Sequence, residues 1–148
     1  MQPPPPTVDN RVLGIFAKWP TPGQVKTRLA AETTPAWAAE VARAFLLETL
    51  SRLDHMPARR VLAFAPADAA AHFANLVQGR YELLPQADGD LGQRMAAYFE
   101  RQRDAGAAAT VLIGTDSPTL PAAYIEQAFA ALKTADVVLG PATDGGYY

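Results

Sequence analysis

The chain of 148 residues has the size of one domain and is long enough to bury a hydrophobic core. Apolar residues make up 49% of it and charged residues 19%, and a net charge of -2 gives no general attraction to nucleic acid or to an anionic membrane. Because there are no cysteines, disulfides, thiolate metal sites and cysteine nucleophiles are excluded.

The first ten residues differ from the rest, because they contain four consecutive prolines. Such a run favours an extended backbone, so we expect residues 1–10 to be a disordered tail and residues 11–148 to form the domain. The sequence has no signal-peptide pattern and no apolar stretch as long as a membrane span. We therefore expect a cytoplasmic protein with no membrane partner and no nucleic-acid partner.

Beyond the tail, short apolar runs alternate with segments of helical periodicity. The runs predict strands at residues 11–17, 60–65, 81–84, 110–113 and 137–139. The periodic segments predict helices at residues 35–53, 67–77, 90–104 and 121–133, the first capped by Thr34. Buried strands separated by helices indicate an α/β, three-layer, Rossmann-like fold with a mainly parallel sheet, in which ligands gather at the carboxyl ends of the strands.

The loop after the first strand, residues 16–29, combines two prolines, a glycine and three cations in the sequence FAKWPTPGQVKTRL. Prolines stiffen a loop, glycine lets the backbone approach a ligand, and cations can converge on one anion. Val25 stands where a P-loop has glycine, and the dinucleotide motif GxGxxG is absent. We expect nucleotide phosphates to bind here by another arrangement, at Lys18, Gly23, Lys26 and Arg28.

Asp116 follows the strand at residues 110–113, in the segment GTDSPTLP. A carboxylate that leaves a buried strand is well placed to bind a hard divalent cation such as Mg²⁺ or Mn²⁺, which would bridge a diphosphate. The alternative is that Asp116 and Ser117 only order the turn before the next helix. The cations of the first loop favour the metal site.

Asp144 lies in the segment GPATDGGYY, residues 140–148. An Asp-Gly pair often marks a tight turn, but two glycines also clear space beside a carboxylate. We interpret Asp144 as a second metal ligand or as a carboxylate on the acceptor side. Tyr147 is expected to contact the sugar or base of a substrate.

The segment QADGDLGQRM, residues 86–95, follows the third predicted strand. It brings Asp90 and Arg94 to the same edge of the sheet, where we expect them to bind substrate. Asp90 is also a candidate N-cap for the helix that follows.

The four segments together resemble the DUF2064 family, which is also described as a glycosyltransferase family associated with arsenosugar biosynthesis. The resemblance covers nearly the whole chain from Val12 and implies a nucleotide-binding domain with the GT-A type of nucleotide-diphospho-sugar transferase fold. It places Lys18, Lys26 and Arg28 at the nucleotide phosphates and Asp116 at the metal. More distantly, the chain is similar to molybdenum-cofactor and phospholactate nucleotidyltransferases.

The resemblance implies an enzyme whose substrate is a nucleoside diphosphate sugar. Metal and cations would stabilise the departing nucleoside diphosphate, and Asp144 could be the base for an acceptor hydroxyl. Three alternatives remain open: nucleotidyl transfer from a nucleoside triphosphate, nucleotide binding without turnover, and a structural domain. Similar proteins continue beyond the DGGYY segment, so we expect a C-terminally truncated fold, with an exposed apolar edge near residues 137–139 that favours a homodimer.

Overall fold

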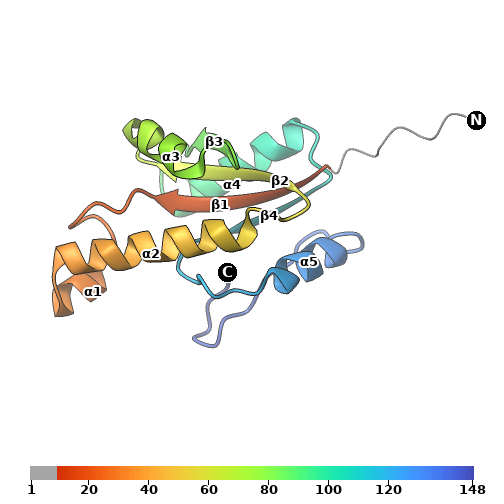
Figure 1. The fold of residues 1–148 in the computed structure, drawn as a ribbon. Helices are drawn as coiled ribbons and strands as arrows, with labels where there is room; N and C mark the ends of the chain where they lie inside the picture. Colours follow the sequence, from red (N-terminus) through yellow and green to blue (C-terminus); the bar gives the residue numbers. More distant parts are fainter. Residues whose placement is uncertain (1–9) are drawn as a thin grey trace, which may run out of the picture.

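The computed structural model describes residues 10–148, so the expected proline-rich tail, residues 1–10, lies outside the described part of the chain except for Asn10. Strands and helices alternate along the chain (Figure 1). The elements are β1 (Arg11–Lys18), α1 (Thr27–Glu32), α2 (Pro35–Leu53), β2 (Arg59–Ala65), the 3-10 helix η1 (Ala67–Ala69), α3 (Ala70–Val77), β3 (Glu82–Pro85), α4 (Leu91–Asp104), β4 (Ala109–Ile113) and α5 (Ala122–Ala131).

These elements form one parallel sheet with the strand order β3-β2-β1-β4. The chain moves outward from β1 to β2 and β3, and then returns to place β4 on the other side of β1. The direction of winding therefore reverses between β1 and β4, and in open α/β sheets ligands bind at such a switch point. The predicted parallel α/β fold is confirmed.

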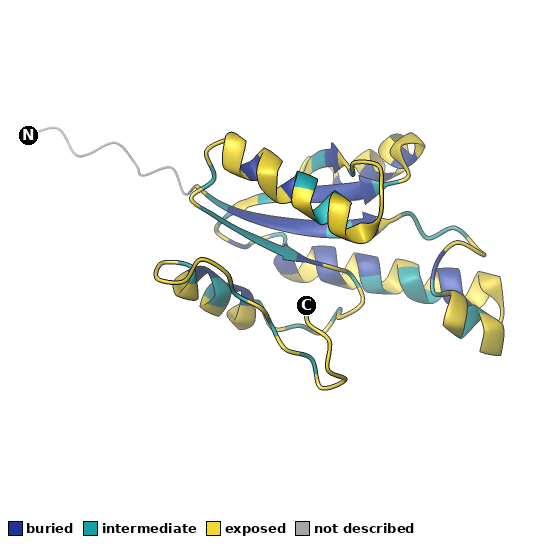
Figure 2. Ribbon diagram, turned by 180° about the vertical axis from the view of Figure 1, so that it is seen from behind, coloured by how far each residue is buried: buried dark blue, intermediate teal, exposed yellow. Residues whose placement is uncertain are grey.

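Each face of the sheet carries its own hydrophobic cluster, because successive strand residues point to opposite sides. The larger cluster joins the sheet to α2, α3 and α5 and includes Leu13, Ile15, Leu50, Leu62, Phe73 and Phe129. The smaller cluster joins the other face to α4 and contains Val12, Val61, Ala63, Leu84 and Tyr98. Figure 2 shows the buried residues concentrated on the strands and on the inner sides of the helices, as a three-layer fold requires.

Local signals at helix starts act as the sequence predicts. The Thr34 side chain accepts a hydrogen bond from the backbone N–H of Trp37 at 3.1 Å, and Pro35 occupies the first helical position of α2. At α4, Asp90 accepts from the N–H of Gln93 while the Gln93 side chain accepts from the N–H of Asp90, both at 2.9 Å. This capping box fixes where α4 begins.

Two expectations about local structure are wrong. Residues 137–139 do not form a buried strand: Val137 is 73% exposed and Leu139 is 63% exposed, and neither pairs with another strand. An apolar run of three residues becomes a strand only if a neighbouring strand pairs with it. The second expectation concerns the segment after β1, which the sequence presents as a loop. Part of it forms a short helix, α1 (Thr27–Glu32).

Gly14, at the centre of β1, has no side chain and lies directly beneath α4. A Cβ built on Gly14 would lie 2.2 Å from the hydroxyl oxygen of Tyr98, so the aromatic ring rests on the strand backbone. The Tyr98 hydroxyl has no hydrogen-bond partner within residues 10–148, and burial raises the pKa of Tyr98 above its usual value. Gly14 therefore sets how closely α4 packs on the sheet.

We expect Gly14→Ala to lower the free energy of unfolding by about 1 to 3 kcal/mol, because the added methyl group would displace the Tyr98 ring. Urea denaturation would measure the change. Gly114→Ala is the matched control, since a Cβ at Gly114 would meet nothing within 4 Å. Equal midpoints for the two variants would contradict the packing of Tyr98 against β1.

Candidate functional site

The loop after β1 has an unusual backbone shape. Gly23 has a φ of 81° and Lys26 a φ of 46°, so both adopt the left-handed conformation. The Nζ atom of Lys18 donates to the backbone oxygen of Gln24 at 2.9 Å and thereby closes the loop on itself. A left-handed lysine costs energy that glycine would not, and such strain is common in segments that hold a ligand.

Lys26 and Asp116 meet although 90 positions separate them in the sequence. The Lys26 ammonium donates to Asp116 Oδ1 at 2.9 Å and lies 4.3 Å from the centre of the Phe45 ring. Only 19% of the Lys26 side chain is exposed, compared with 88% of the Asp116 side chain. The contact joins the loop after β1 to the loop after β4, and so lies at the switch point of the sheet.

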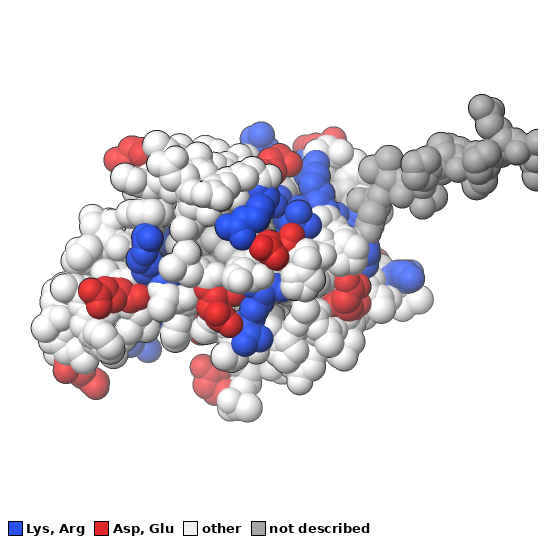
Figure 3. All heavy atoms as spheres, in the orientation of Figure 1, with Lys and Arg blue, Asp and Glu red and all other residues white. Residues whose placement is uncertain are grey.

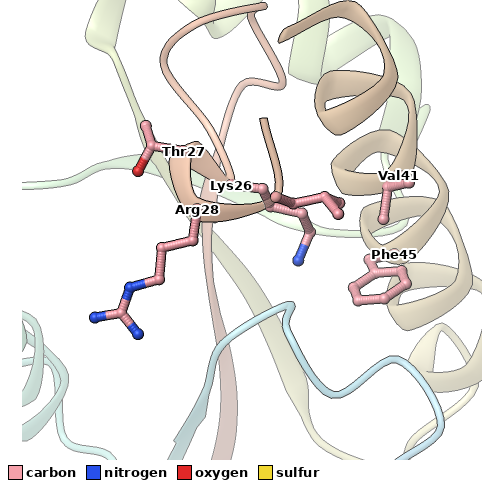
Figure 4. Close-up of a pocket in the computed structure, with 6 residues that line it drawn as sticks. Lys26, Thr27, Arg28, Val41 and Phe45 are labelled. Atoms are coloured by element: carbon pink, nitrogen blue, oxygen red, sulfur yellow. The ribbon is translucent and has the colours of Figure 1, made fainter. Parts of the chain in front are cut away.

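A pocket of about 450 Å³ surrounds the start of α1. Its lining comprises Lys26, Thr27, Arg28, Leu29, Val41 and Phe45. In Figure 4 the Lys26 amine lies near Phe45 of α2, whereas the Arg28 side chain extends away from both. The three cations expected at the phosphates therefore do not point at one position in this structure: Lys18 contacts its own loop, Lys26 contacts Asp116 and Arg28 extends outward.

A larger open groove of about 1490 Å³ runs along the free edge of β4. We call it the β4 groove; its lining comes from α4, β4, α5 and the last residues of the chain, and includes Leu91, Met95, Asp116, Ser117 and Tyr147. Asp116 thus stands between Lys26 and this groove. The loop that carries Asp116 and the side chain of Tyr147 both contribute to the lining of this groove.

Asp144 and Asp90 have structural contacts at their carboxylates. Oδ1 of Asp144 accepts from the backbone N–H of Gly146 at 3.0 Å, within a turn that Gly145 completes with a φ of 89°. Oδ1 of Asp90 accepts from Gln93 in the capping box of α4. Asp144 therefore acts as a turn residue and Asp90 as an N-cap, and within residues 10–148 no hydrogen bond is seen to the second carboxylate oxygen of either residue.

Gln86 is a residue that sequence reasoning missed. Its side-chain Nε2 donates to the backbone oxygen of Ala63 at 2.8 Å and of Ala17 at 3.3 Å, while its Oε1 accepts from Arg94 Nη1 at 3.1 Å. Gln86 thus links the ends of β1 and β2 to the first turn of α4. The only signal in the sequence is its position directly after the third strand.

The distribution of charge agrees with a local site. Figure 3 shows basic and acidic side chains mixed on one face of the molecule, with no continuous basic surface on that face. Among residues 10–148, no group of three or more His, Asp or Glu side chains could hold a metal ion. Mg²⁺ commonly uses one or two carboxylates together with substrate phosphates, and the exposed Asp116 fits this pattern.

Comparison with known proteins gives one family and a related structure. The family model described as "Uncharacterized protein conserved in bacteria (DUF2064)" matches residues 47–148. The crystal structure of a "putative nucleotide-diphospho-sugar transferase" from Desulfovibrio desulfuricans G20 has a TM-score of 0.88 and 32% sequence identity, and covers 95% of this chain. The chain spans 62% of the length of that protein. No curated protein matches the chain.

The matched regions cover the site in different ways. Asp116, Asp144 and Arg94 lie inside the family match, whereas the loop that carries Lys26 precedes it. The structural alignment, which covers 95% of the chain, supports the same α/β fold for both proteins. Within the described part of the chain, no helix is long and apolar enough to cross a membrane.

Proposed function

Because the chain belongs to the DUF2064 family, and shares its fold with the transferase structure compared above, we propose that it is a nucleotide-sugar-dependent glycosyltransferase. The observation that carries this proposal is the contact between Lys26 and Asp116 at the switch point of the sheet. A cation and a carboxylate side by side can bind the two components of a metal–diphosphate complex.

In the proposed reaction, the acceptor hydroxyl attacks the anomeric carbon of the donor sugar. The bond from that carbon to the diphosphate oxygen breaks, and its electron pair leaves with the nucleoside diphosphate. Lys26 and Arg28 would offset the negative charge that grows on the leaving group. Asp116 would hold Mg²⁺ or Mn²⁺, which supplies further positive charge to the diphosphate when it is bound.

Binding would require Lys26 and Asp116 to exchange partners. Lys26 would release the carboxylate and donate to a phosphate oxygen, and Asp116 would become free to bind the cation. The exposure of Asp116 supports this exchange, because its side chain can move without disturbing the core. Phosphate and metal should therefore bind together more tightly than either binds alone.

The β4 groove is the proposed acceptor side, with Tyr147 in its lining. Asp144 is the proposed base for the acceptor hydroxyl and a second candidate for the metal, through the carboxylate oxygen that Gly146 does not contact. Asp90 and Arg94 are proposed substrate contacts at the start of α4.

Calorimetry with a panel of nucleoside diphosphates, nucleoside triphosphates and nucleotide sugars, with and without Mn²⁺, would test the proposal. We expect nucleoside diphosphates and their sugars to bind, and to bind more tightly with the metal. If nucleoside triphosphates bind best and release pyrophosphate in the presence of a phosphate acceptor, the activity is nucleotidyl transfer. If no nucleotide binds under either condition, the proposed site is wrong.

A further inference from the structure

Phe45 is an aromatic residue of α2 that belongs to neither hydrophobic cluster of the domain. Its neighbours on the helix, Leu46 and Leu50, are buried in the larger cluster, whereas Phe45 is only partly buried and lines the pocket at the start of α1. An aromatic side chain contributes most to stability when its large apolar surface is buried in the core. The position of Phe45 on the pocket therefore indicates a role in the site.

The Lys26 ammonium lies over the Phe45 ring, 4.3 Å from its centre (Figure 4). The same ammonium donates to Asp116 Oδ1 at 2.9 Å, and the Lys26 side chain is only 19% exposed. A lysine side chain has a flexible four-carbon stem and loses rotamer freedom when its position is fixed. Phe45 and Asp116 together therefore hold in place a charge that would otherwise move in solvent.

The two partners of Lys26 differ in what they would do when a ligand binds. In the proposed exchange, Asp116 turns to the metal and its hydrogen bond with Lys26 is lost. The face of an aromatic ring attracts a cation through the ring quadrupole, and it carries no negative charge that would repel a phosphate. A carboxylate in the place of Phe45 would repel the phosphate and compete for the N–H groups of the ammonium. The ring can therefore keep its contact with Lys26 while phosphate is bound.

From these contacts we propose that Phe45 is a positioning residue for Lys26: its ring fixes the ammonium at the phosphate position and remains its partner after Asp116 has turned to the metal. This inference rests on the proposed nucleotide site. Phe45 is suited to the role because the buried side of α2, a helix of 19 residues, anchors it to the sheet. Of the other cations of the loop, Lys18 donates to its own loop and Arg28 extends away from Phe45.

Dissociation constants for inorganic pyrophosphate in the presence of Mn²⁺ would test this role. Phe45→Leu should weaken the binding of pyrophosphate by about threefold to tenfold, whereas Phe45→Tyr, which keeps the ring, should stay within about twofold of the wild-type protein. In the Lys26→Met background, Phe45→Leu should have no further effect, because the cation that the ring holds is gone. Trp37→Leu is the matched control, since Trp37 is an exposed aromatic residue of the same helix.

A second measurement needs no phosphate ligand. The rate at which an amine-reactive ester acetylates Lys26, followed by mass spectrometry of the peptides, reports how firmly the ammonium is held. Acetylation of Lys26 should be faster in Phe45→Leu than in the wild-type protein, Phe45→Tyr or Trp37→Leu. Acetylation of the exposed Lys133 should be the same in all four proteins.

The outcomes separate this inference from the function on which it rests. If pyrophosphate binds to none of the proteins, the proposed nucleotide site is wrong and the inference falls with it, whatever the acetylation rates show. If pyrophosphate binds equally well to the wild-type protein and to Phe45→Leu, the positioning role is overturned and the phosphate site stands. If Phe45→Leu weakens binding equally with Lys26 present or replaced, the ring acts through general packing and the inference is overturned. Equal acetylation of Lys26 in the two proteins would also overturn it.

Discussion

Asp116→Asn should abolish the effect of Mn²⁺ on the binding of nucleoside diphosphates. Asparagine has nearly the same shape as aspartate but lacks the charge that a divalent cation requires, and no cluster of three acidic or histidine side chains could replace it within residues 10–148. We expect the affinity in Mn²⁺ to fall to the level measured with a chelator. Without metal, affinity should stay the same or rise slightly, because Lys26 loses its ionic partner.

Calorimetric titrations of UDP and GDP, each with Mn²⁺ or with EDTA, would measure this difference. Asp136→Asn is the matched control, because Asp136 also lines the β4 groove and no contact with Lys26 is seen. Its metal dependence should equal that of the wild-type protein. If Asp116→Asn retains the full effect of Mn²⁺, the cation binds elsewhere and the role assigned to Asp116 is incorrect.

Lys26→Met should weaken every ligand that carries phosphate, by a similar factor for each. Methionine keeps an unbranched stem that can pack on Phe45 but removes the ammonium group. A charge-assisted hydrogen bond contributes about 1.5 to 3 kcal/mol, which corresponds to a loss of roughly tenfold to a hundredfold in affinity. The stimulation by Mn²⁺ should persist, since Asp116 is unchanged.

The same variant has a second expected effect that a general loss of structure would not produce. Once Asp116 has lost its cationic neighbour, Mn²⁺ alone should bind more tightly to Lys26→Met than to the wild-type protein. Lys133→Met, on the exposed segment after α5, is the control for removal of a lysine. Unchanged phosphate affinity in Lys26→Met would show that the contact with Asp116 is only structural.

Local patterns predicted the elements whose formation depends on local chemistry. The caps at Thr34 and Asp90, and four of the five strands, lie close to their predicted positions. The strand predicted at residues 137–139 is absent. Whether a short apolar run becomes a strand is decided by pairing with another strand, which no local pattern encodes. The helix α1 was missed because six residues without a capping side chain give too weak a signal.

The site could be predicted only in part, for a similar reason. The rule that loops gather at the carboxyl ends of parallel strands brought Lys26 and Asp116 together correctly. The role of Gln86 could not be foreseen, because its partners are backbone carbonyls of two strands that only folding places side by side. The sequence offers structural interpretations of Asp90 as an N-cap and of Asp144 as a turn residue, and both of these contacts are present in the structure.

The missing side chain at Gly14 has a consequence for the position of α4. Tyr98 rests on that bare stretch of backbone, and Arg94 lies one helical turn earlier on the same side of α4. A larger residue in the middle of the central strand would lift the helix and carry the guanidinium away from Gln86. The proposed substrate contact of Arg94 therefore depends on packing in the interior of the protein, at a position that no ligand would touch.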